Sequence, residues 1–141
     1  MVTIKELIES REPYFVRDSA TVLEAAEFMA SRNIGAVCVI DEQKRLTGIF
    51  SERDLLKRVT VHRKDPATVP IRDVMTKPRA VIEITGTPHE ALESMERIGS
   101  RHLPVVEGER WVGMLSIRDI MRVELGEQTS ELQLLHEYIS H

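Results

Sequence analysis

The sequence has one cysteine, no long hydrophobic run and no surplus of positive charge. The lone cysteine, Cys38, cannot form an internal disulfide, and its position inside the apolar run at 36–40 predicts a buried, unreactive thiol. The apolar runs are far shorter than the roughly 18 residues that a membrane-spanning helix needs. Residues 3–12 lack the apolar core of a secretion signal. These absences predict a cytoplasmic protein that has no membrane partner.

Charge and motif content exclude other classes of protein. The chain has 19 Lys and Arg against 23 Asp and Glu, so no global positive field attracts nucleic acid. It contains neither a Walker loop nor a G-x-G-x-x-G motif, and its five histidines lack the spacing of a zinc site. No nucleophile and base stand at a spacing typical of catalysis. We therefore expect no nucleic-acid partner, no metal site and no enzymatic activity.

The 141 residues of the chain suffice for one compact unit or for two small fused halves. Comparing the chain with itself reveals two copies of one unit at an offset of 65 or 66 residues. The identical residues are Thr21, Glu24, Ala25, Glu27, Met29, Val39, Arg45, Gly48, Ser51, Arg53 and Asp54 in the first copy, and Thr87, Glu90, Ala91, Glu93, Met95, Val105, Arg110, Gly113, Ser116, Arg118 and Asp119 in the second. The one-residue slip falls in a polar stretch at 41–46, where a hairpin turn can absorb it.

Each copy has the pattern β-α-β-β-α. A short apolar stretch leads to a T-x-x-E capping box at Thr21 or Thr87, which predicts a helix start. Two β-rich runs follow, and a second helix begins at Ser51 or Ser116. We predict an α+β fold in which the two copies form small sheets that pack on each other with pseudo-two-fold symmetry.

The predicted organisation has five parts. They are an N-terminal helical segment at 1–11, a first repeat at 12–59, a linker at 60–73, a second repeat at 74–125 and a helical tail at 126–141. Two prolines and a basic cluster mark the linker. The tail places Leu132, Leu135 and Ile139 on one helical face beyond a break at Gly126, which indicates a packing or dimerisation helix.

The most specific feature is a doubled G-h-h-S-x-R-D motif, in which h is apolar: GIFSERD and GMLSIRD. It takes the end of a strand into a helix start, with Ser51 or Ser116 as the N-cap and Asp54 or Asp119 near the positive end of the helix dipole. A structural interpretation is that S-x-x-D is a capping box variant, which needs no ligand. A functional one is that a hydroxyl, backbone N–H groups and a carboxylate suit the phosphate and ribose of a nucleotide. Capping does not require the glycine or the arginine, and their recurrence favours the functional interpretation.

Together these features resemble the tandem repeat of the cystathionine-β-synthase (CBS) domain family, a paired unit also called a Bateman module. The resemblance rests on TVLEAAEFMASRNIGAVCVID, LTGIFSERDLLKRV, IRDVMT, RHLPVV and WVGMLSIRDIM, and it covers residues 12 to about 125. It implies a regulatory module that binds an adenosine compound in clefts between the repeats. The expected effector is AMP, ADP or ATP, with NAD and S-adenosylmethionine as further candidates, and no cofactor is required.

The resemblance also implies a homodimer that acts through its own geometry or on a partner protein. A ligand-free dimerisation or protein-interaction module is the alternative that stays open, because capping alone would then explain both motifs.

The resemblance implies site residues in both copies. Asp54 and Asp119 are expected to contact the ribose, with Ser51 and Ser116 near the phosphates. The expected wall against the adenine is Ile34, Gly35, Ala36, Val37, Arg101, His102, Leu103 and Pro104, with Ser19, Thr21, Thr85 and Thr87 lining the same cleft.

The two copies differ where phosphate would bind. The second has Arg101 and His102 where the first has a glycine and an alanine, and Arg118 is a further candidate donor. We therefore expect the cleft around Asp119 to be the better phosphate site.

Two departures from the family pattern bear on the fold. The first repeat lacks the Asp-Val-Met-Thr sequence found before the second at 73–76, so its leading strand is expected to pack differently. Pro104 falls in the middle of a strand, where a central ladder would lose a hydrogen bond, and this predicts an edge position or a ligand-facing irregularity.

Overall fold

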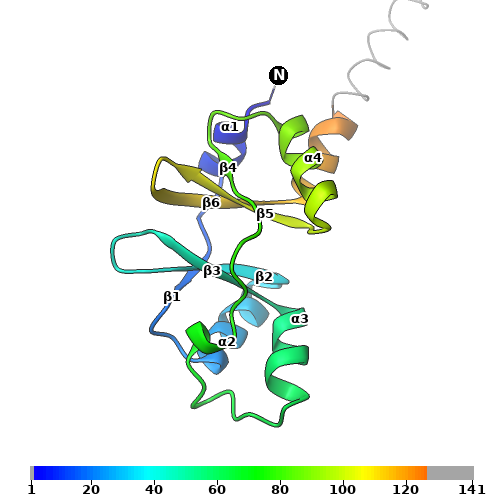
Figure 1. The fold of residues 1–141 in the computed structure, drawn as a ribbon. Helices are drawn as coiled ribbons and strands as arrows, with labels where there is room; N and C mark the ends of the chain where they lie inside the picture. The colour runs from blue at the N-terminus through cyan, green and yellow to red at the C-terminus, as the bar shows by residue number, and fades with distance from the viewer. Residues whose placement is uncertain (1, 127–141) are drawn as a thin grey trace, which may run out of the picture.

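The computed structural model describes residues 2–126 and shows two stacked halves, each a three-stranded sheet with helices on its outer side (Figure 1). The first half contains β1 (Phe15–Arg17), α2 (Val22–Arg32), β2 (Ala36–Ile40), β3 (Leu46–Ser51), α3 (Glu52–Asp54) and the π-helical turn η1 (Leu55–Thr60), and α1 (Ile4–Glu9) precedes it. The second contains β4 (Ile82–Glu83), α4 (Pro88–Ile98), β5 (His102–Glu107), β6 (Arg110–Ser116) and a helix at 117–126, and the 3-10 turn η2 (Ile71–Asp73) precedes it. The α+β class and the duplicated β-α-β-β-α unit are confirmed.

Both long helices begin at the predicted threonines. The hydroxyl of Thr21 accepts a hydrogen bond from the backbone N–H three residues on at 3.2 Å, and that of Thr87 does so at 3.1 Å. α2 ends at Asn33 and α4 at Gly99, with φ values of 54° and 65° in the left-handed region that closes a helix. Local sequence signals therefore fix both ends of these helices.

The two sheets share one topology. Their strand orders are β1-β2-β3 and β4-β5-β6, and in each the first pair is parallel and the second is an antiparallel hairpin. Each hairpin has one register shift, after Val39 and after Val105. The two hairpin turns differ in length, and this absorbs the slip between the copies.

The sheets face each other, as predicted. Cys38 and Ile40 of β2 and Trp111 of β6 form a buried cluster between them, and Phe15 meets Trp111 edge-on with ring centroids 5.5 Å apart. The predicted burial of Cys38 is confirmed, and burial raises the pKa of its thiol to about 12.

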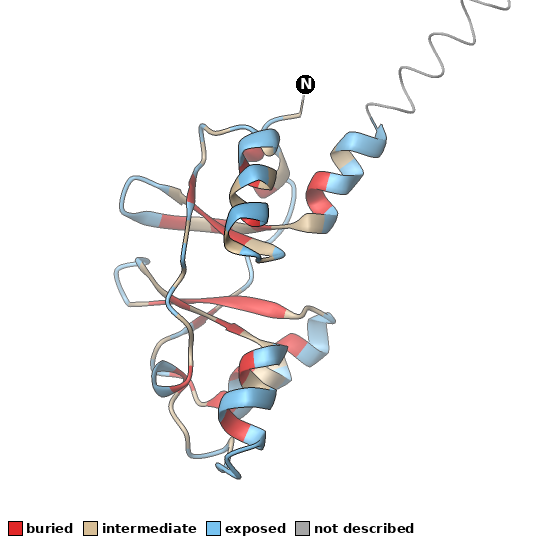
Figure 2. Ribbon diagram, turned by 45° about the vertical axis from the view of Figure 1, so that its right-hand side comes forward, coloured by how far each residue is buried: buried red, intermediate tan, exposed pale blue. Residues whose placement is uncertain are grey.

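The outer face of each sheet is covered by its own helices and by the stretch that precedes the other half in the chain. We call these stretches, residues 4–14 and 71–81, the leading segments. Ile4 and Ile8 of the first leading segment are buried in the core of the second half, and Ile71 and Val74 of the second are buried in the core of the first. Figure 2 shows the buried positions on the strands and on the helix faces turned toward them. The end of the predicted linker therefore belongs to the first core.

The glycines of the doubled motif are explained by this exchange. A Cβ added at Gly48 would lie 2.5 Å from Met75 Sδ, and one at Gly113 would lie 2.8 Å from Ile8 Cδ1. Each glycine lets a leading segment cross a strand at close range. The glycine therefore has a packing role, and it does not by itself point to a ligand as the sequence suggested.

Pro104 is in the middle strand of its sheet, so the edge position is wrong and the alternative, a ligand-facing irregularity, stays a prediction. The pairing of β5 with the short β4 begins only at Val105, one residue beyond the proline, and the register shift of the hairpin follows. The missing N–H of Pro104 is tolerated there because the parallel ladder does not reach it.

The C-terminal region differs from the prediction in one respect. The helix at 117–126 is still helical at Gly126, where the sequence predicts a break. The predicted tail helix with Leu132, Leu135 and Ile139 lies outside the described residues. Within residues 2–126, no helix is long and apolar enough to cross a membrane.

Candidate functional site

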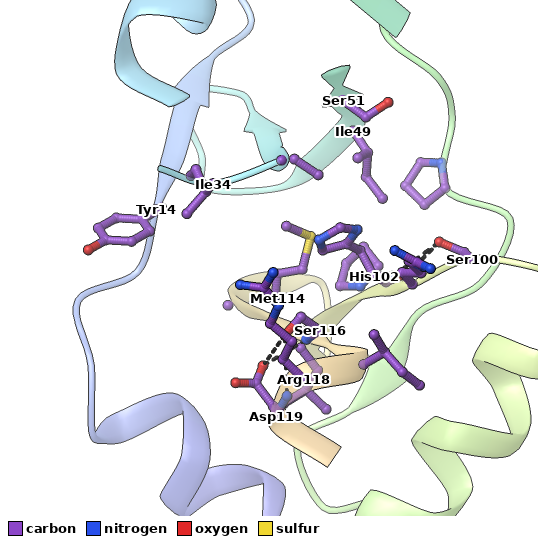
Figure 3. A pocket seen from close by; sticks show the side chains of 18 of the residues that line it. Tyr14, Ile34, Ile49, Ser51, Ser100, His102, Met114, Ser116, Arg118 and Asp119 are labelled. Carbon is purple, nitrogen blue, oxygen red and sulfur yellow. Dashed lines mark hydrogen bonds between the residues drawn. The ribbon is translucent and has the colours of Figure 1, made fainter. Parts of the chain in front are cut away.

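A cleft of about 840 Å³ runs along the seam between the two halves. We call it the seam cleft; its walls include the carboxyl ends of β3 and β6, the helix starts that follow them and both leading segments (Figure 3). Eleven predicted site residues line it: Ile34, Gly35, Ala36, Ser51 and Asp54 from the first half, and Arg101, His102, Pro104, Ser116, Arg118 and Asp119 from the second. The fold thus brings both copies of the doubled motif to one cleft.

Six predicted residues do not line the seam cleft. Val37 and Leu103 are fully buried in the two cores, because neighbouring positions along a strand point to opposite faces. The other four, Ser19, Thr21, Thr85 and Thr87, follow the carboxyl ends of β1 and β4. Those strands run antiparallel to β3 and β6. Their carboxyl ends therefore lie at the end of each sheet that is away from the seam cleft. The prediction that these six residues line the cleft is corrected for this reason.

Each Ser–Asp pair of the doubled motif caps its helix. Asp54 Oδ2 accepts hydrogen bonds from the backbone N–H and the hydroxyl of Ser51 at 2.9 and 3.0 Å. Asp119 Oδ2 accepts the same pair from Ser116 at 2.7 and 3.2 Å. The structural interpretation is therefore satisfied at both positions. Capping uses Oδ2, however, and the Oδ1 atom of each carboxylate contacts the other half's leading segment.

In the first half this contact comes from Thr76. Its hydroxyl donates to Asp54 Oδ1 at 2.8 Å, and its backbone exchanges hydrogen bonds with Ile49 of β3 at 2.8 and 2.9 Å. Thr76 ends the Asp-Val-Met-Thr sequence. The second leading segment is thus fastened to the first half by both main chain and side chain.

In the second half the contact comes from Arg11. Its Nη1 donates to Asp119 Oδ1 at 2.6 Å and its Nη2 donates to Asp119 Oδ2 at 2.9 Å. Nη2 also donates to the carbonyl oxygen of Met114 at 2.7 Å. Burial opposes ionisation of Asp119, but the hydrogen bonds and positive charge of Arg11, with the bonds from Ser116, outweigh it and hold the pKa of this carboxyl below its usual value.

Arg11 was missed by reasoning from the sequence. It stands 108 residues from Asp119, and no local pattern links the two. The absence of Asp-Val-Met-Thr before the first repeat indicated only that the leading strand of that repeat would pack differently.

The seam cleft is positive on balance although the chain has a net charge of −4. Among the described lining residues are six cationic side chains and four carboxylates: Arg11, Arg53, Lys77, Arg79, Arg101 and Arg118, and Glu12, Glu52, Asp54 and Asp119. This surplus suits an anionic ligand.

The second half is better equipped for an anion than the first. Arg101, Arg118 and the partly buried His102 come from that half, and its motif has Ile117 where the first has Glu52. Burial lowers the pKa of His102, which Arg101 reinforces while Asp119 and Glu52 oppose it. An incoming anion would act in the opposite sense and favour the protonated ring.

The cleft also offers apolar surface. Ile34 and Ile49 on one side and Met114 and Pro104 on the other line it, and Tyr14 lines it as well (Figure 3). Within the described part of the chain, no group of three or more His, Cys, Asp and Glu side chains could hold a metal ion. The arrangement provides hydrogen-bond acceptors, cations and apolar surface.

A comparison with protein families matches the CBS domain twice, over residues 4–61 and 71–126. CBS domain-containing protein CBSX3, mitochondrial, of Arabidopsis thaliana is 34% identical over 123 residues, which are 84% of this chain and 60% of that protein. This chain therefore spans less than two thirds of that relative.

Two solved structures have the same fold over nearly the whole chain. A protein with CBS domains from Burkholderia ambifaria superposes with a TM-score of 0.79 at 25% identity, covering 90% of this chain and 96% of that one. A CBS domain protein from Pyrobaculum aerophilum, complexed with AMP, superposes with a TM-score of 0.72 at 31% identity, covering 84% and 89%.

Proposed function

The chain belongs to the CBS domain family, and we propose that its tandem pair is a regulatory module that binds an adenine nucleotide in the seam cleft. AMP, ADP and ATP are the first candidates, followed by NAD and S-adenosylmethionine. The observation that carries the proposal is that two Ser–Asp helix starts and a surplus of cationic side chains converge on one cleft.

Asp119 is the proposed ribose contact. Its Oδ2 is held by Ser116, which fixes the orientation of the carboxylate, and its Oδ1 accepts from Arg11, which also lines the cleft. A carboxylate accepts hydrogen bonds from two neighbouring hydroxyls, which is the pattern a ribose presents. Asp54 offers the same group in the first half.

The phosphate is proposed to lie among Arg101, His102 and Arg118. An arginine donates two parallel hydrogen bonds to a phosphate, and such charge-assisted bonds are about twice as strong as neutral ones. Ser100 braces this wall, since its hydroxyl accepts from the backbone N–H of His102 at 3.2 Å and donates to the carbonyl of the same residue at 2.9 Å (Figure 3).

The adenine is proposed to lie against the apolar surface of Ile34, Met114 and Pro104. Small-molecule sites are usually apolar with a few placed polar groups, as here. The AMP complex of the Pyrobaculum relative supports a nucleotide of this class. We propose binding without turnover, because the cleft residues have roles in holding a ligand and none in activating a nucleophile.

Regulation would follow from the exchange of leading segments. A ligand that takes the place of Arg11 or Thr76 on a carboxylate weakens the hold of one half on the other's leading segment. Different affinity for the fastened and the loosened arrangement is sufficient to shift their populations. The ligand signal would reach a homodimer partner or another protein through this change.

The proposed homodimer would use the helices that end each half. Leu56 on η1 is 57% exposed, and Met121 and Leu125 on the helix at 117–126 are 53% and 58% exposed. Light scattering after size exclusion should give twice the chain mass of 16.1 kDa. A mass of one chain would count against the dimer but leave nucleotide binding intact.

Isothermal titration with AMP, ATP, NAD and S-adenosylmethionine tests the proposal. We expect saturable heat with at least one of the phosphorylated ligands at a stoichiometry of one or two per chain. The competing candidate is a ligand-free interaction module, which is favoured by the fully satisfied caps at Ser51 and Ser116. Silence from all four ligands would support that candidate instead.

A further inference from the structure

Arg11 occupies the position at Asp119 that the proposed ribose needs. Three hydrogen bonds of 2.6 to 2.9 Å join its guanidinium to both carboxylate oxygens and to the carbonyl of Met114. A ribose hydroxyl at Asp119 Oδ1 would compete with this side chain for the carboxylate. The inference drawn from this contact rests on the proposed function.

This contact can break without a change in the backbone, because only the side chain of Arg11 makes it. At the equivalent place in the first half, the backbone of Thr76 pairs with Ile49, whose counterpart in β6 is Met114. In the second half, the guanidinium of Arg11 takes over the bond to that strand. The side chain of Arg11 is 39% exposed whereas that of Asp119 is 7% exposed, so the arginine can turn into solvent or cleft while Ile4 and Ile8 keep α1 in place.

Displacing Arg11 has a different cost for different ligands. A nucleoside replaces the guanidinium with two neutral hydroxyls and leaves the arginine without an anion in a cleft already lined by Arg101 and Arg118. A nucleotide brings its own anion, so the guanidinium exchanges a carboxylate for a phosphate and keeps an anionic partner. S-adenosylmethionine brings a further positive charge and no phosphate.

We infer that Arg11 makes the Asp119 half of the seam cleft selective for phosphorylated adenosine compounds. Its guanidinium competes with the ribose of every ligand for Asp119. Once displaced, it binds the phosphate of those ligands that carry one. AMP, ADP, ATP and NAD fall within this class, and adenosine and S-adenosylmethionine fall outside it.

Titrations of AMP and adenosine into the wild type, Arg11→Gln and Lys5→Gln test the inference. Lys5→Gln is the matched control, since it removes a positive charge from α1 at a side chain that is 63% exposed and outside the cleft. In Arg11→Gln we expect adenosine to bind more tightly and the ratio of AMP to adenosine affinity to fall at least about tenfold. In Lys5→Gln the ratio should stay at the wild-type value.

An unchanged ratio in Arg11→Gln, with AMP still bound, would overturn the selectivity and leave the proposed function standing. If neither ligand binds to any of the three proteins, the selectivity fails, whereas the proposed function fails only if ATP, NAD and S-adenosylmethionine are silent as well. Should Arg11→Gln not fold, wild-type protein decides the matter: adenosine affinity should rise when inorganic phosphate replaces chloride at equal ionic strength. Phosphate that leaves adenosine affinity unchanged or lowers it would overturn the inference.

Discussion

The hydroxyl of Thr76 is 2.8 Å from Asp54 Oδ1, so a residue of the second leading segment donates a hydrogen bond to the carboxylate of the first half. Arg11 of the first leading segment donates to Asp119 of the second half. The two halves are therefore fastened to each other reciprocally. We call these two contacts, Thr76–Asp54 and Arg11–Asp119, the clasps, and each lies at a proposed ligand position. Ligand binding and the attachment of the leading segments are coupled because they use the same oxygen atoms.

Replacing Thr76 with valine tests the first clasp. The variant keeps the shape of the side chain and the backbone pairing with Ile49 but removes the donor to Asp54, which is 9% exposed. Because a nearly buried carboxylate oxygen then loses its close partner, we expect the free energy of unfolding to fall by about 1–2 kcal/mol. Urea denaturation measures the change. Thr68→Val, at an exposed hydroxyl with a 3.3 Å bond to a carbonyl, is the control and should change stability by less than about 0.5 kcal/mol. Equal effects at the two positions would contradict the clasp.

Replacing Gly113 with alanine tests the packing of α1 on β6. The added Cβ would lie 2.8 and 2.9 Å from Cδ1 and Cγ2 of Ile8, a stiff side chain that is buried in the second core. We expect a loss of about 1–3 kcal/mol in unfolding free energy from overpacking. The smaller side chain in Ile8→Ala/Gly113→Ala should bring the cost of the alanine down. Gly126→Ala is the control, because its added Cβ would meet no described atom within 4 Å. A neutral Gly113→Ala would show that α1 does not sit against β6 in solution.

Some features of the fold could be predicted from the sequence and others could not. The helix starts at Thr21, Thr87, Ser51 and Ser116 could be predicted because a cap is a local signal. Arg11 could not be found, because its role depends on a chain path that brings residues 108 positions apart into contact. Periodicity predicts which residues face a core. It does not predict the direction of each strand, which decides whether the carboxyl end of that strand lies at the cleft or at the opposite end of the sheet.

The thiol of Cys38 should resist modification in the folded protein. Burial raises its pKa to about 12, so at pH 8 its thiolate fraction is about a thousandfold below that of an ordinary cysteine with a pKa near 8.5. A chromogenic disulfide reagent should react slowly with native protein and rapidly in urea. The native rate should follow the equilibrium constant of opening when stability is varied. Fast reaction of the native protein would mean that the two sheets separate readily.

The pH dependence of stability should report the ion pair of Asp119. Because the folded pKa lies below that of the unfolded chain, the carboxylate contributes stability above about pH 4, and this contribution is lost as the pH falls through the folded pKa. Asp119→Asn should therefore destabilise the protein by about 2 kcal/mol at pH 6, and the difference from wild type should shrink below pH 4. In an Arg11→Gln background the same substitution should cost less at pH 6, since the strongest hydrogen-bonding partner of the carboxylate is gone. A constant difference from pH 6 to pH 3 would contradict the lowered pKa.

The two aspartates should differ in their effect on nucleotide binding. Asp119→Ala should weaken AMP binding by at least about tenfold, because its half supplies Arg101, His102 and Arg118 for the phosphate. Asp54→Ala should have the smaller effect, since the first half has a glycine and an alanine in place of the arginine and histidine and adds the carboxylate of Glu52. Titration calorimetry on both variants measures the losses, and thermal melts confirm that each remains folded at the temperature used. Equal losses, or a greater one at Asp54, would mean that the charge surplus of the second half does not decide where the phosphate binds. AMP would then bind mainly at a site that Arg11 does not touch, and Arg11 could not determine the selectivity.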